Sequence, residues 1–518
     1  MNPEPSTPPP RRGRLGLALA AVLWVLPLWT IPFPPMLDYP QQLAVAAMVR
    51  WIGDPVRGFG QAYELALWHP QGLFEMVTAG LAWLLPIEVA GKLVVSLSIA
   101  AILPAAMALC RRAGRPEWYG LLALAVTYNH VFFWGFVDSL IAAPLFLGGL
   151  ALADRIVEER PGLRGWCLLA GLTVLFYTAH LQMLFLFAGA VGWLALVRRP
   201  PVRTLAFHLS ALLPGTALGA GVLAWVHIHS AEVMTGFQRY LDGQATIILA
   251  TGEKAGRVPG LLFGVYSDGT QEVLGLILAA AVLILALHRV SSGADRTDLL
   301  VRTRFATLAG WILLLFFLLP EFSSGYLVSE RLVPLAAMVM VAGLPRPSLA
   351  RRRLAAAATV LLLGLQLSSV LDGFRTFGVE TAGLRKVLSA AEPGQALAGL
   401  MLEQSNSTWM APADLLRHFP AYYQVERGGR VALSFALFFN APVRYRPGAW
   451  EDEVLARWPE ADAWRFDLPR DGDRFRYFLV RGGRDDLRRV FGPRLAKARV
   501  TSSVRWHLVD LSPDLDKR

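Results

Sequence analysis

The chain has 518 residues, of which 54% are hydrophobic and 17% are charged. Soluble domains carry about 25% charged residues, so this balance excludes an ordinary soluble protein and indicates a membrane protein. The formal net charge is +11, but the arginines stand at the ends of apolar runs and form no stripe with interleaved aromatic residues. This pattern argues against nucleic acid as a partner and predicts contact with membrane lipid.

Residues 1–14 form a proline-rich tail that carries Arg11, Arg12 and Arg14. The apolar run from residue 15 to residue 33 follows, and no small-residue cleavage site stands before its outer end. We therefore expect this run to be an uncleaved membrane anchor behind a cytoplasmic basic tail.

Long apolar runs recur from residue 15 to residue 372. A helix needs roughly 17–25 residues to cross a hydrocarbon core of ~30 Å, and about eleven runs close to this length can be placed. They predict a transmembrane domain over 15–372 with large outer loops at 35–87 and 228–270. The predicted spans are 15–34, 88–110, 117–134, 138–154, 166–180, 181–197, 204–227, 271–289, 305–320, 331–345 and 353–372.

Basic clusters fall at every second gap between these spans. The positive-inside rule places such gaps in the cytoplasm. With an odd number of spans, the N-terminus is then inside and the C-terminus outside, and we expect a multi-pass protein of the inner (plasma) membrane. After the N-terminal tail, the clusters lie within residues 111–115, 155–164, 198–203, 289–304 and 346–353.

The first outer loop is predicted to hold two amphipathic helices, near 41–52 and 71–85. The second of them is apolar but short, and Glu75 lies within it. If it crossed the membrane, the arginine cluster at 111–115 would lie outside, against the charge rule. We therefore predict that it lies along the outer membrane surface, as interfacial helices do.

The composition after residue 372 changes to mixed charge with short alternating apolar runs. The pattern predicts strands at 476–480 and 504–511 and a helix at 485–490. A segment of about 145 residues is large enough to have its own core, so we expect residues 373–518 to form an extracytoplasmic soluble α/β domain. The predicted fold class is an α-helical polytopic membrane protein with this domain at its C-terminus.

Asp38 is the sharpest candidate for chemistry. It follows the first predicted span by a few residues, and Pro34, Pro35 and Pro40 restrict the chain around it. A carboxylate held at the membrane face suits a general base for a sugar or lipid hydroxyl. The alternative is a cap for the following helix, because Asp ahead of a helix with an early proline is common.

Other polar residues fall at the predicted outer turns, namely Asn129, His130, Asp138 and His180. Such groups are costly at membrane depth and tend to face a bundle interior or a water-filled cavity, so we expect one outward-facing site. Helix capping by Asp138 and simple burial of His180 are the structural alternatives. Asp38, Asp138 and His180 could bind a divalent metal, but no pair has i, i+3 or i+4 spacing. The metal stays an open alternative, and no cofactor is assigned.

Basic residues near the outer face are candidates for binding a phosphate. Arg331 begins the tenth predicted span beside Glu330, and the second outer loop carries Arg239, Lys254 and Arg257. Guanidinium groups bind phosphates through charge-assisted hydrogen bonds. Snorkelling, or pairing with Glu330, is the structural alternative for Arg331.

In its organisation the chain resembles the GT-C superfamily of integral-membrane glycosyltransferases, which use polyprenyl-phosphate sugar donors. The shared features are a cytoplasmic N-terminus, a long first outer loop with membrane-lying helices and an early acid, about a dozen spans and an outer C-terminal domain. In such enzymes the first-loop acid is the catalytic base, which implies that role for Asp38. Many members have a paired acidic motif, whereas here Tyr39 and Pro40 follow Asp38.

The resemblance implies transfer of a hexosyl or pentosyl group from a polyprenyl-phosphate donor to a glycan, lipid or protein acceptor on the outer face. Asp138 and His180 would shape the acceptor side, with His130 and Asn129 also at the substrate. Arg331, Arg239 and Lys254 would hold the donor phosphate.

Two other classes of function stay open. One is a transporter or flippase for a lipid-linked substrate, and the other is a non-catalytic membrane assembly protein. Transporters commonly show internal repeats and matched broken helices, whereas the two halves of this sequence do not match. A structure in which Asp38 lines an outward cavity would favour the enzyme.

Overall fold

The computed structural model describes residues 11–67, 70–159, 162–229, 249–266, 268–286, 296–320, 328–346, 348–405, 414–438, 440–449 and 462–512. The chain divides into two compact units. Unit 1 consists of Met1–Thr30, Val95–Trp225 and Ala245–Gly373. Unit 2 consists of Ile31–Val94, Val226–Gln244 and Phe374–Arg518.

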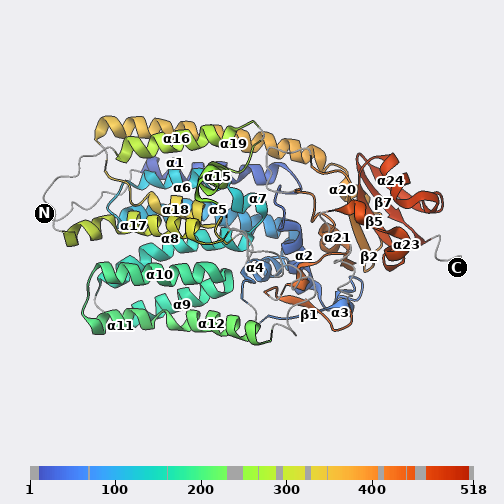
Figure 1. Cartoon of the computed structure of the whole chain (residues 1–518), viewed down its shortest axis with the longest axis horizontal. Coiled ribbons are helices and arrows are strands. Elements are labelled where there is room, and N and C mark those ends of the chain that lie inside the picture. Colours follow the sequence, from blue (N-terminus) through green and yellow to red (C-terminus); the bar gives the residue numbers. More distant parts are fainter. Residues whose placement is uncertain are drawn as a thin grey trace. The chain divides into compact units, whose positions relative to one another are not determined.

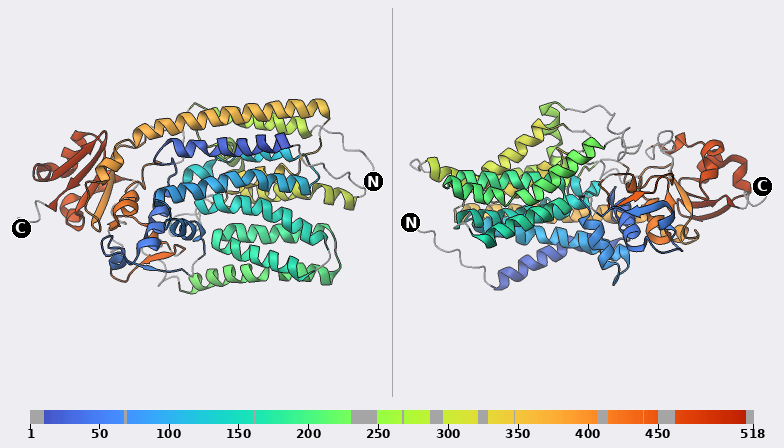
Figure 2. Two further views of the ribbon diagram at one scale, coloured as in Figure 1. Left: turned by 180° about the vertical axis from the view of Figure 1, so that it is seen from behind. Right: turned by 90° about the horizontal axis from the view of Figure 1, so that it is seen from below.

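Unit 1 is helical throughout its described part (Figure 1). Helices α8, α9 and α10 pack against one another, and Figure 2 shows them side by side from two further directions. Three of the helices, α5, α12 and α19, continue into unit 2. The helices are α1 (Arg11–Thr30), α5 (Ile87–Arg112), η1 (Glu117–Tyr119), α6 (Gly120–Ala125), α7 (His130–Trp134), α8 (Val137–Glu158), α9 (Leu163–Ala179), α10 (Leu181–Val197), α11 (Val202–Ser210), α12 (Leu213–Ile228), α15 (Thr251–Phe263), α16 (Thr270–Ala286), α17 (Arg296–Leu318), α18 (Leu332–Met340) and α19 (Leu349–Glu380).

Four described helices, α5, α8, α17 and α19, are long and apolar enough to cross a membrane, and the bent pair α11 and α12 would make a fifth span. Helices α1, α9, α10 and α16 have shorter apolar stretches. Each of these helices coincides with a predicted span. The predicted class of α-helical polytopic membrane protein is confirmed, whereas the number of about eleven spans stays a prediction.

The predicted span at 117–134 is wrong as a continuous helix, because α6 ends at Ala125 and α7 begins at His130. The side chain of Asn129 accepts a hydrogen bond from the Phe132 N–H (3.1 Å) and donates one to the Val126 carbonyl (2.7 Å). Asn commonly makes such local bonds, which compete with helical backbone bonding and favour an N-cap. This chemistry breaks the span.

Two further predicted spans have a different form in the structure. Residues 204–227 form α11 and α12, which are bent by 55°. The break precedes Pro214, which has no N–H to donate in a continuous helix. Residues 331–345 contain only the nine-residue α18, which at 1.5 Å per residue is about half as long as the hydrocarbon core is thick.

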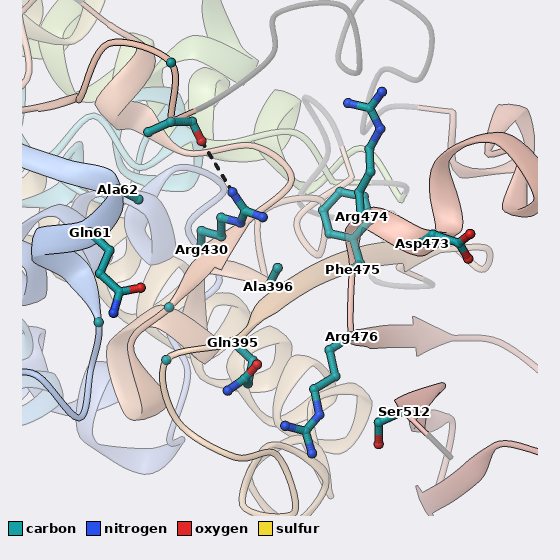
Figure 3. A pocket seen from close by; sticks show the side chains of 15 residues that line it. Gln61, Ala62, Gln395, Ala396, Arg430, Asp473, Arg474, Phe475, Arg476 and Ser512 are labelled. Carbon is teal, nitrogen blue, oxygen red and sulfur yellow. Dashed lines mark hydrogen bonds between the residues drawn. The ribbon is translucent and has the colours of Figure 1, made fainter. Parts of the chain in front are cut away.

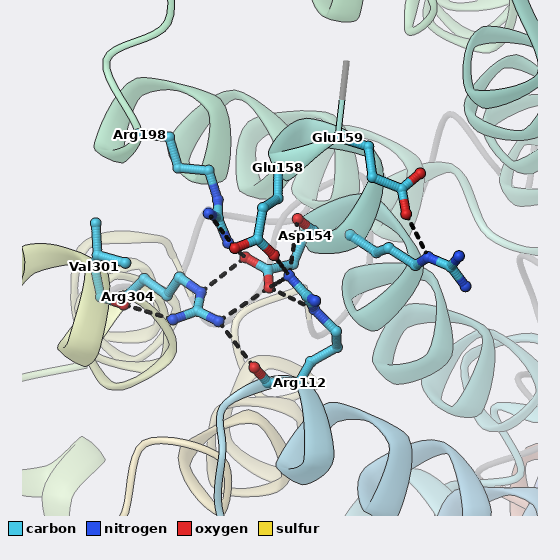
Figure 4. Close-up of polar contacts among 8 residues, drawn as sticks. Arg112, Asp154, Glu158, Glu159, Arg198, Val301 and Arg304 are labelled. Atoms are coloured by element: carbon cyan, nitrogen blue, oxygen red, sulfur yellow. Dashed lines mark hydrogen bonds and ion pairs between the residues drawn. The ribbon is translucent and has the colours of Figure 1, made fainter. Parts of the chain in front are cut away.

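A buried ion cluster joins four helices of unit 1 (Figure 4). The carboxylate of Asp154, on α8, is fully buried and accepts two hydrogen bonds from Arg304, at 2.7 and 3.0 Å. Arg198 donates to it at 3.0 Å and Arg112 at 2.9 Å. Charged groups stay buried only when they are paired and hydrogen-bonded, and this cluster links α5, α8, α10 and α17.

Unit 2 combines the first predicted outer loop with the C-terminal segment. The predicted helices at 41–52 and 71–85 are present as α2 and α4, and the predicted elements at 476–480, 485–490 and 504–511 as β5, α24 and β7. The position of α4 on a membrane surface stays a prediction. The main elements are α2 (Tyr39–Trp51), α3 (Phe59–Ala62), β1 (Tyr63–Leu65), α4 (Leu73–Leu81), α20 (Leu384–Leu388), β2 (Ala396–Met401), α21 (Ala421–Arg427), β3 (Arg430–Val431), η3 (Phe435–Leu437), β4 (Val443–Tyr445), η4 (Ala463–Arg465), α23 (Leu468–Asp471), η5 (Gly472–Arg474), β5 (Tyr477–Arg481), α24 (Arg484–Phe491), η6 (Gly492–Ala496), β6 (Arg499–Ser503) and β7 (Trp506–Asp510).

A five-stranded sheet with the order β3-β2-β5-β7-β6 forms the core of the C-terminal segment. Strand β2 is parallel to β3 and β5, and β7 is antiparallel to β5 and β6. Every residue of β5 is buried, as expected for a central strand covered on both faces. Leu487 and Phe491, four residues apart on α24, pack into the same core as Phe478 and Val509.

The first-loop segment is bonded directly to the C-terminal segment within unit 2. Strand β1 pairs antiparallel with β4, with Tyr63 opposite Tyr445. The fully buried amide of Gln41, on α2, donates to the Leu433 carbonyl (2.8 Å) and accepts from the Phe435 N–H (3.1 Å). These bonds fix α2 against residues 433–435.

Candidate functional site

Asp38 occupies the N-cap position of α2, immediately before Tyr39 and Pro40. Its backbone carbonyl accepts hydrogen bonds from the N–H groups of Gln41 (3.0 Å) and Gln42 (3.1 Å). Its carboxylate makes no side-chain cap bond, which is the bond that the capping alternative requires. Asp38 therefore occupies the N-cap position of α2, but its carboxylate does not bond to the first N–H groups of the helix.

The carboxylate of Asp38 meets a histidine from the C-terminal segment. His418 Nε2 lies 3.5 Å from Asp38 Oδ1, and both side chains are mostly buried. The imidazole also packs edge-on against the ring of Phe435 at 5.6 Å. Because Gln41 bonds to the backbone of Phe435, the same contact that fixes α2 also fixes the wall behind His418.

Sequence reasoning missed His418. It is a lone histidine in a turn before α21, without a motif or a spacing that relates it to Asp38. Only the pairing of the first-loop segment with the C-terminal segment brings the two side chains together. Tyr39, the neighbour of Asp38, is fully buried, and burial together with Glu88 raises the pKa of its hydroxyl, so this phenol stays neutral.

The second group of polar residues lies in unit 1, around Glu330 and Arg331. Glu330 is fully buried, and its two oxygens lie 2.5 Å from Arg257 Nη2 and 2.5 Å from His130 Nε2. Arg257 comes from α15 and His130 from the start of α7. Glu330 thus contacts both Arg257 and His130 just before the start of α18.

Arg331 lies over the ring of Phe136 at 3.7 Å, and its Nη1 lies 2.7 Å from His180 Nε2 and 3.5 Å from Ser139 Oγ. Since a guanidinium can only donate, His180 Nε2 accepts, and the proton of a neutral imidazole is then on Nδ1. His180 Nδ1 is buried and has no hydrogen-bond partner among the described residues. Asp138 is buried in the first turn of α8, beside Ser139.

The structure gives Asn129 and Lys254 contacts that differ from those of a substrate site. Asn129 caps α7. Lys254 is fully buried on α15, a helix within the predicted outer loop, and its ammonium donates to the carbonyls of Phe316 (2.8 Å) and Leu319 at the end of α17. Both arrangements favour structural roles, the second because cations stabilise helix C-termini. Arg239 lies outside the described residues.

The predicted site residues fall into both units. His130, Asp138, His180 and Arg331 belong to unit 1, whereas Asp38 belongs to unit 2. Their convergence on one cavity therefore stays a prediction. Within the described ranges, no three His, Cys, Asp or Glu side chains gather as a metal site would require.

No family model matches the chain, and no curated protein matches its sequence. Solved structures match it over nearly the whole length. The crystal structure of ArnT from Cupriavidus metallidurans bound to undecaprenyl phosphate has a TM-score of 0.56 at 14% identity, covering 97% of this chain and 98% of that one. The apo state of the same protein has a TM-score of 0.56 at 13% identity, covering 97% and 99%. The chain therefore shares the fold of these solved structures over nearly its whole length.

Proposed function

We propose that this protein is a membrane glycosyltransferase that moves a sugar from a polyprenyl-phosphate donor to a hydroxyl of a glycan, lipid or protein acceptor. The observation that carries the proposal is the whole-length likeness to a structure bound to undecaprenyl phosphate. The first-loop acid supports it, because the Asp38 carboxylate makes no cap bond and faces His418.

In the proposed reaction, Asp38 accepts the proton of the acceptor hydroxyl while that oxygen attacks the anomeric carbon of the donor. The bond from the anomeric carbon to the phosphate oxygen breaks, and polyprenyl phosphate leaves with the electron pair. A single attack of this kind inverts the configuration at the anomeric carbon. General-base catalysis contributes typically about 10²–10⁴-fold to the rate.

His418 is proposed to orient this base. A proton on His418 Nε2 would be donated to Asp38 Oδ1 and would hold the carboxylate in a fixed orientation. The distance of 3.5 Å is long for a hydrogen bond, and such contacts often tighten only when substrate is bound.

Arg331 and Arg257 are proposed to hold the donor phosphate, with Asp138 and His180 beside the substrate. Arg331 has a rigid support from Phe136 and His180, and the Arg257 side chain is 40% exposed despite its pair with Glu330. Supported guanidinium groups bind phosphates with defined geometry. The Nδ1–H of His180 adds a buried donor. We propose that the chemistry takes place on the outer face of the inner membrane, with the C-terminal domain on the same side.

The test is transfer from a radiolabelled polyprenyl-phosphate sugar by the purified protein in detergent. Asp38→Asn should lower turnover by about 10²-fold or more, because the amide cannot accept the proton. Asn is itself a good N-cap, so a purely structural role would leave activity and folding nearly unchanged. His418→Gln should lower turnover less than Asp38→Asn does.

Asp54→Asn is the matched control, because Asp54 lies in the same first-loop segment and the described contacts of its side chain are local, with the Val56 N–H and Arg57. It should retain activity. Unchanged turnover in Asp38→Asn would remove Asp38 from the mechanism. An inactive wild type across a broad panel of donors would favour the transporter or the assembly protein.

A further inference from the structure

Unit 2 contains a polar cavity of about 650 Å³ that the proposed transfer does not use. Strands β2, β3 and β5 run parallel, so their first residues lie at one edge of the sheet, and the cavity opens there (Figure 3). Residues 395–396, Arg430 and Arg476 contribute from these strand starts, and Gln61 contributes from α3. Neither Asp38 nor His418 lines it.

The walls of this cavity depend on glycines in the left-handed backbone region. Gly394 has φ +74° and Gly429 has φ +72°. A Cβ atom at Gly429 would lie 2.1 Å from the Gln395 carbonyl oxygen, and one at Gly394 would lie 2.9 Å from that of Val56. No other residue type permits this conformation and this close approach. The turns at the strand starts therefore keep a defined shape.

Arg430 lies at the centre of the residues shown in Figure 3. Its guanidinium is half-buried and donates to the Ala449 carbonyl at 3.4 Å, and no carboxylate of the described chain pairs with it. Arg476 differs, because both oxygens of Glu392 bind its guanidinium, at 2.7 and 2.8 Å. A partly desolvated guanidinium without a carboxylate attracts an anionic ligand.

Neutral hydrogen-bonding groups line the cavity together with the charged residues Arg430, Asp473, Arg474 and Arg476. The side chains of Gln61, Gln395 and Ser512 line the cavity and make no hydrogen bond with any described residue. Amide and hydroxyl groups can both donate and accept, as sugar hydroxyls require. The volume is within the range of roughly 300–1,000 Å³ for small-molecule sites.

We propose that this cavity binds an anionic saccharide, a sugar that carries a phosphate or a carboxylate. Arg430 binds the anionic group, and Gln61, Gln395 and Ser512 bind the sugar hydroxyls. The site is independent of the proposed transfer, because none of these side chains takes part in it. A failure of the transfer assay would leave this binding untouched.

Isothermal titration of the full chain in detergent tests the site. The ligands are glucose 1-phosphate and galacturonate, with neutral glucose and inorganic phosphate as comparisons. We expect both anionic sugars to bind, and glucose and phosphate each to bind at least about tenfold more weakly, since each lacks one set of contacts. Inorganic phosphate binding as tightly as glucose 1-phosphate would contradict a saccharide site.

Arg430→Gln should weaken binding of both anionic sugars at least about tenfold. Arg444→Gln is the matched control, because Arg444 is an exposed arginine of β4 that pairs with Glu64 outside the cavity. Gln61→Leu removes an exposed amide and should weaken glucose 1-phosphate but not inorganic phosphate, which keeps the test valid if Arg430→Gln does not fold. Absence of binding to the wild type at about 10 mM sugar, or equal affinities in Arg430→Gln and the wild type, would overturn the proposal.

Discussion

Glu426 is a buried carboxylic acid that makes the stability of unit 2 depend on pH. Arg385 links it to Glu88, with its Nε 3.4 Å from Glu426 and its Nη2 3.0 Å from Glu88. Burial, with a smaller contribution from Glu88, raises the pKa of Glu426 to about 7. An unfolded chain would ionise this group near pH 4.3. Between these two values only the unfolded state loses the proton, so the free energy of unfolding falls as the pH rises and reaches its lower value above pH 7.

Glu426→Gln should remove this dependence. Relative to the wild type, the variant should gain stability between about pH 4.5 and 7, by on the order of 3 kcal/mol at the upper end. The midpoint of thermal unfolding of the purified protein in detergent, determined over this pH range, measures this difference. Parallel pH curves for the two proteins would contradict the raised pKa.

Single residues differed in how far the sequence could reveal their roles. Asp38 could be singled out because prolines and a span end surround it, and those are local signals. His418 could not, since its relation to Asp38 exists only through Gln41 and the pairing of β1 with β4. Lys254 was expected to bind phosphate, but hydropathy does not reveal that α15 turns this side chain toward the carbonyl end of α17.

At the scale of elements, the Asp154 cluster should stabilise the bundle strongly. Asp154→Asn would leave the guanidinium groups of Arg112, Arg198 and Arg304 without their shared carboxylate (Figure 4). Breaking a buried charged pair costs about 3–5 kcal/mol. We expect a lower midpoint of thermal unfolding in detergent and a smaller folded fraction by size-exclusion chromatography.

Glu159→Gln provides the control for this variant on the same helix end. Glu159 pairs with Arg155 at 2.7 Å, but both side chains are more than half exposed. Exposed pairs contribute well under about 1 kcal/mol, so this variant should unfold close to the wild type. Equal unfolding midpoints for Asp154→Asn and Glu159→Gln would show that the cluster contributes little.

The elements that could be predicted are those whose signal is periodic and uninterrupted. Helices α5 and α8 are long apolar runs. The strands β5 and β7 are short, mainly apolar runs that each end in a charged residue. The break at 126–129 could not be read from hydropathy, because it rests on hydrogen bonds of the Asn129 side chain inside an apolar stretch. The sequence signal for a span measures composition, not continuity.

At the scale of the whole molecule, the sequence predicts a domain boundary at residue 372, where the amino-acid composition changes. The two compact units of the structure are instead defined by contacts between residues, and their boundaries differ. Residues 31–94 are compact with the C-terminal segment, although residues 95–373 separate them along the chain. Hydropathy has no information on such long-range pairing. If residues 31–94 and the C-terminal segment form one unit, both must lie on the same side of the membrane, which the alternation of arginine clusters also predicts.

Cysteine labelling in intact cells tests this topology. Both native cysteines are replaced first, because the exposed Cys167 would react with the reagent and the buried Cys110 could react after unfolding. Single cysteines are then placed at the exposed positions Asp473 and Arg352. We expect a membrane-impermeant reagent to label the cysteine at position 473, whereas the one at 352 should react only after permeabilisation, since arginine clusters stay in the cytoplasm. A third cysteine at the partly exposed Asp54 position should behave like the one at 473. The reverse pattern at 473 and 352 would show that the number of spans before the C-terminal segment is even, and would place the proposed chemistry on the other face of the membrane.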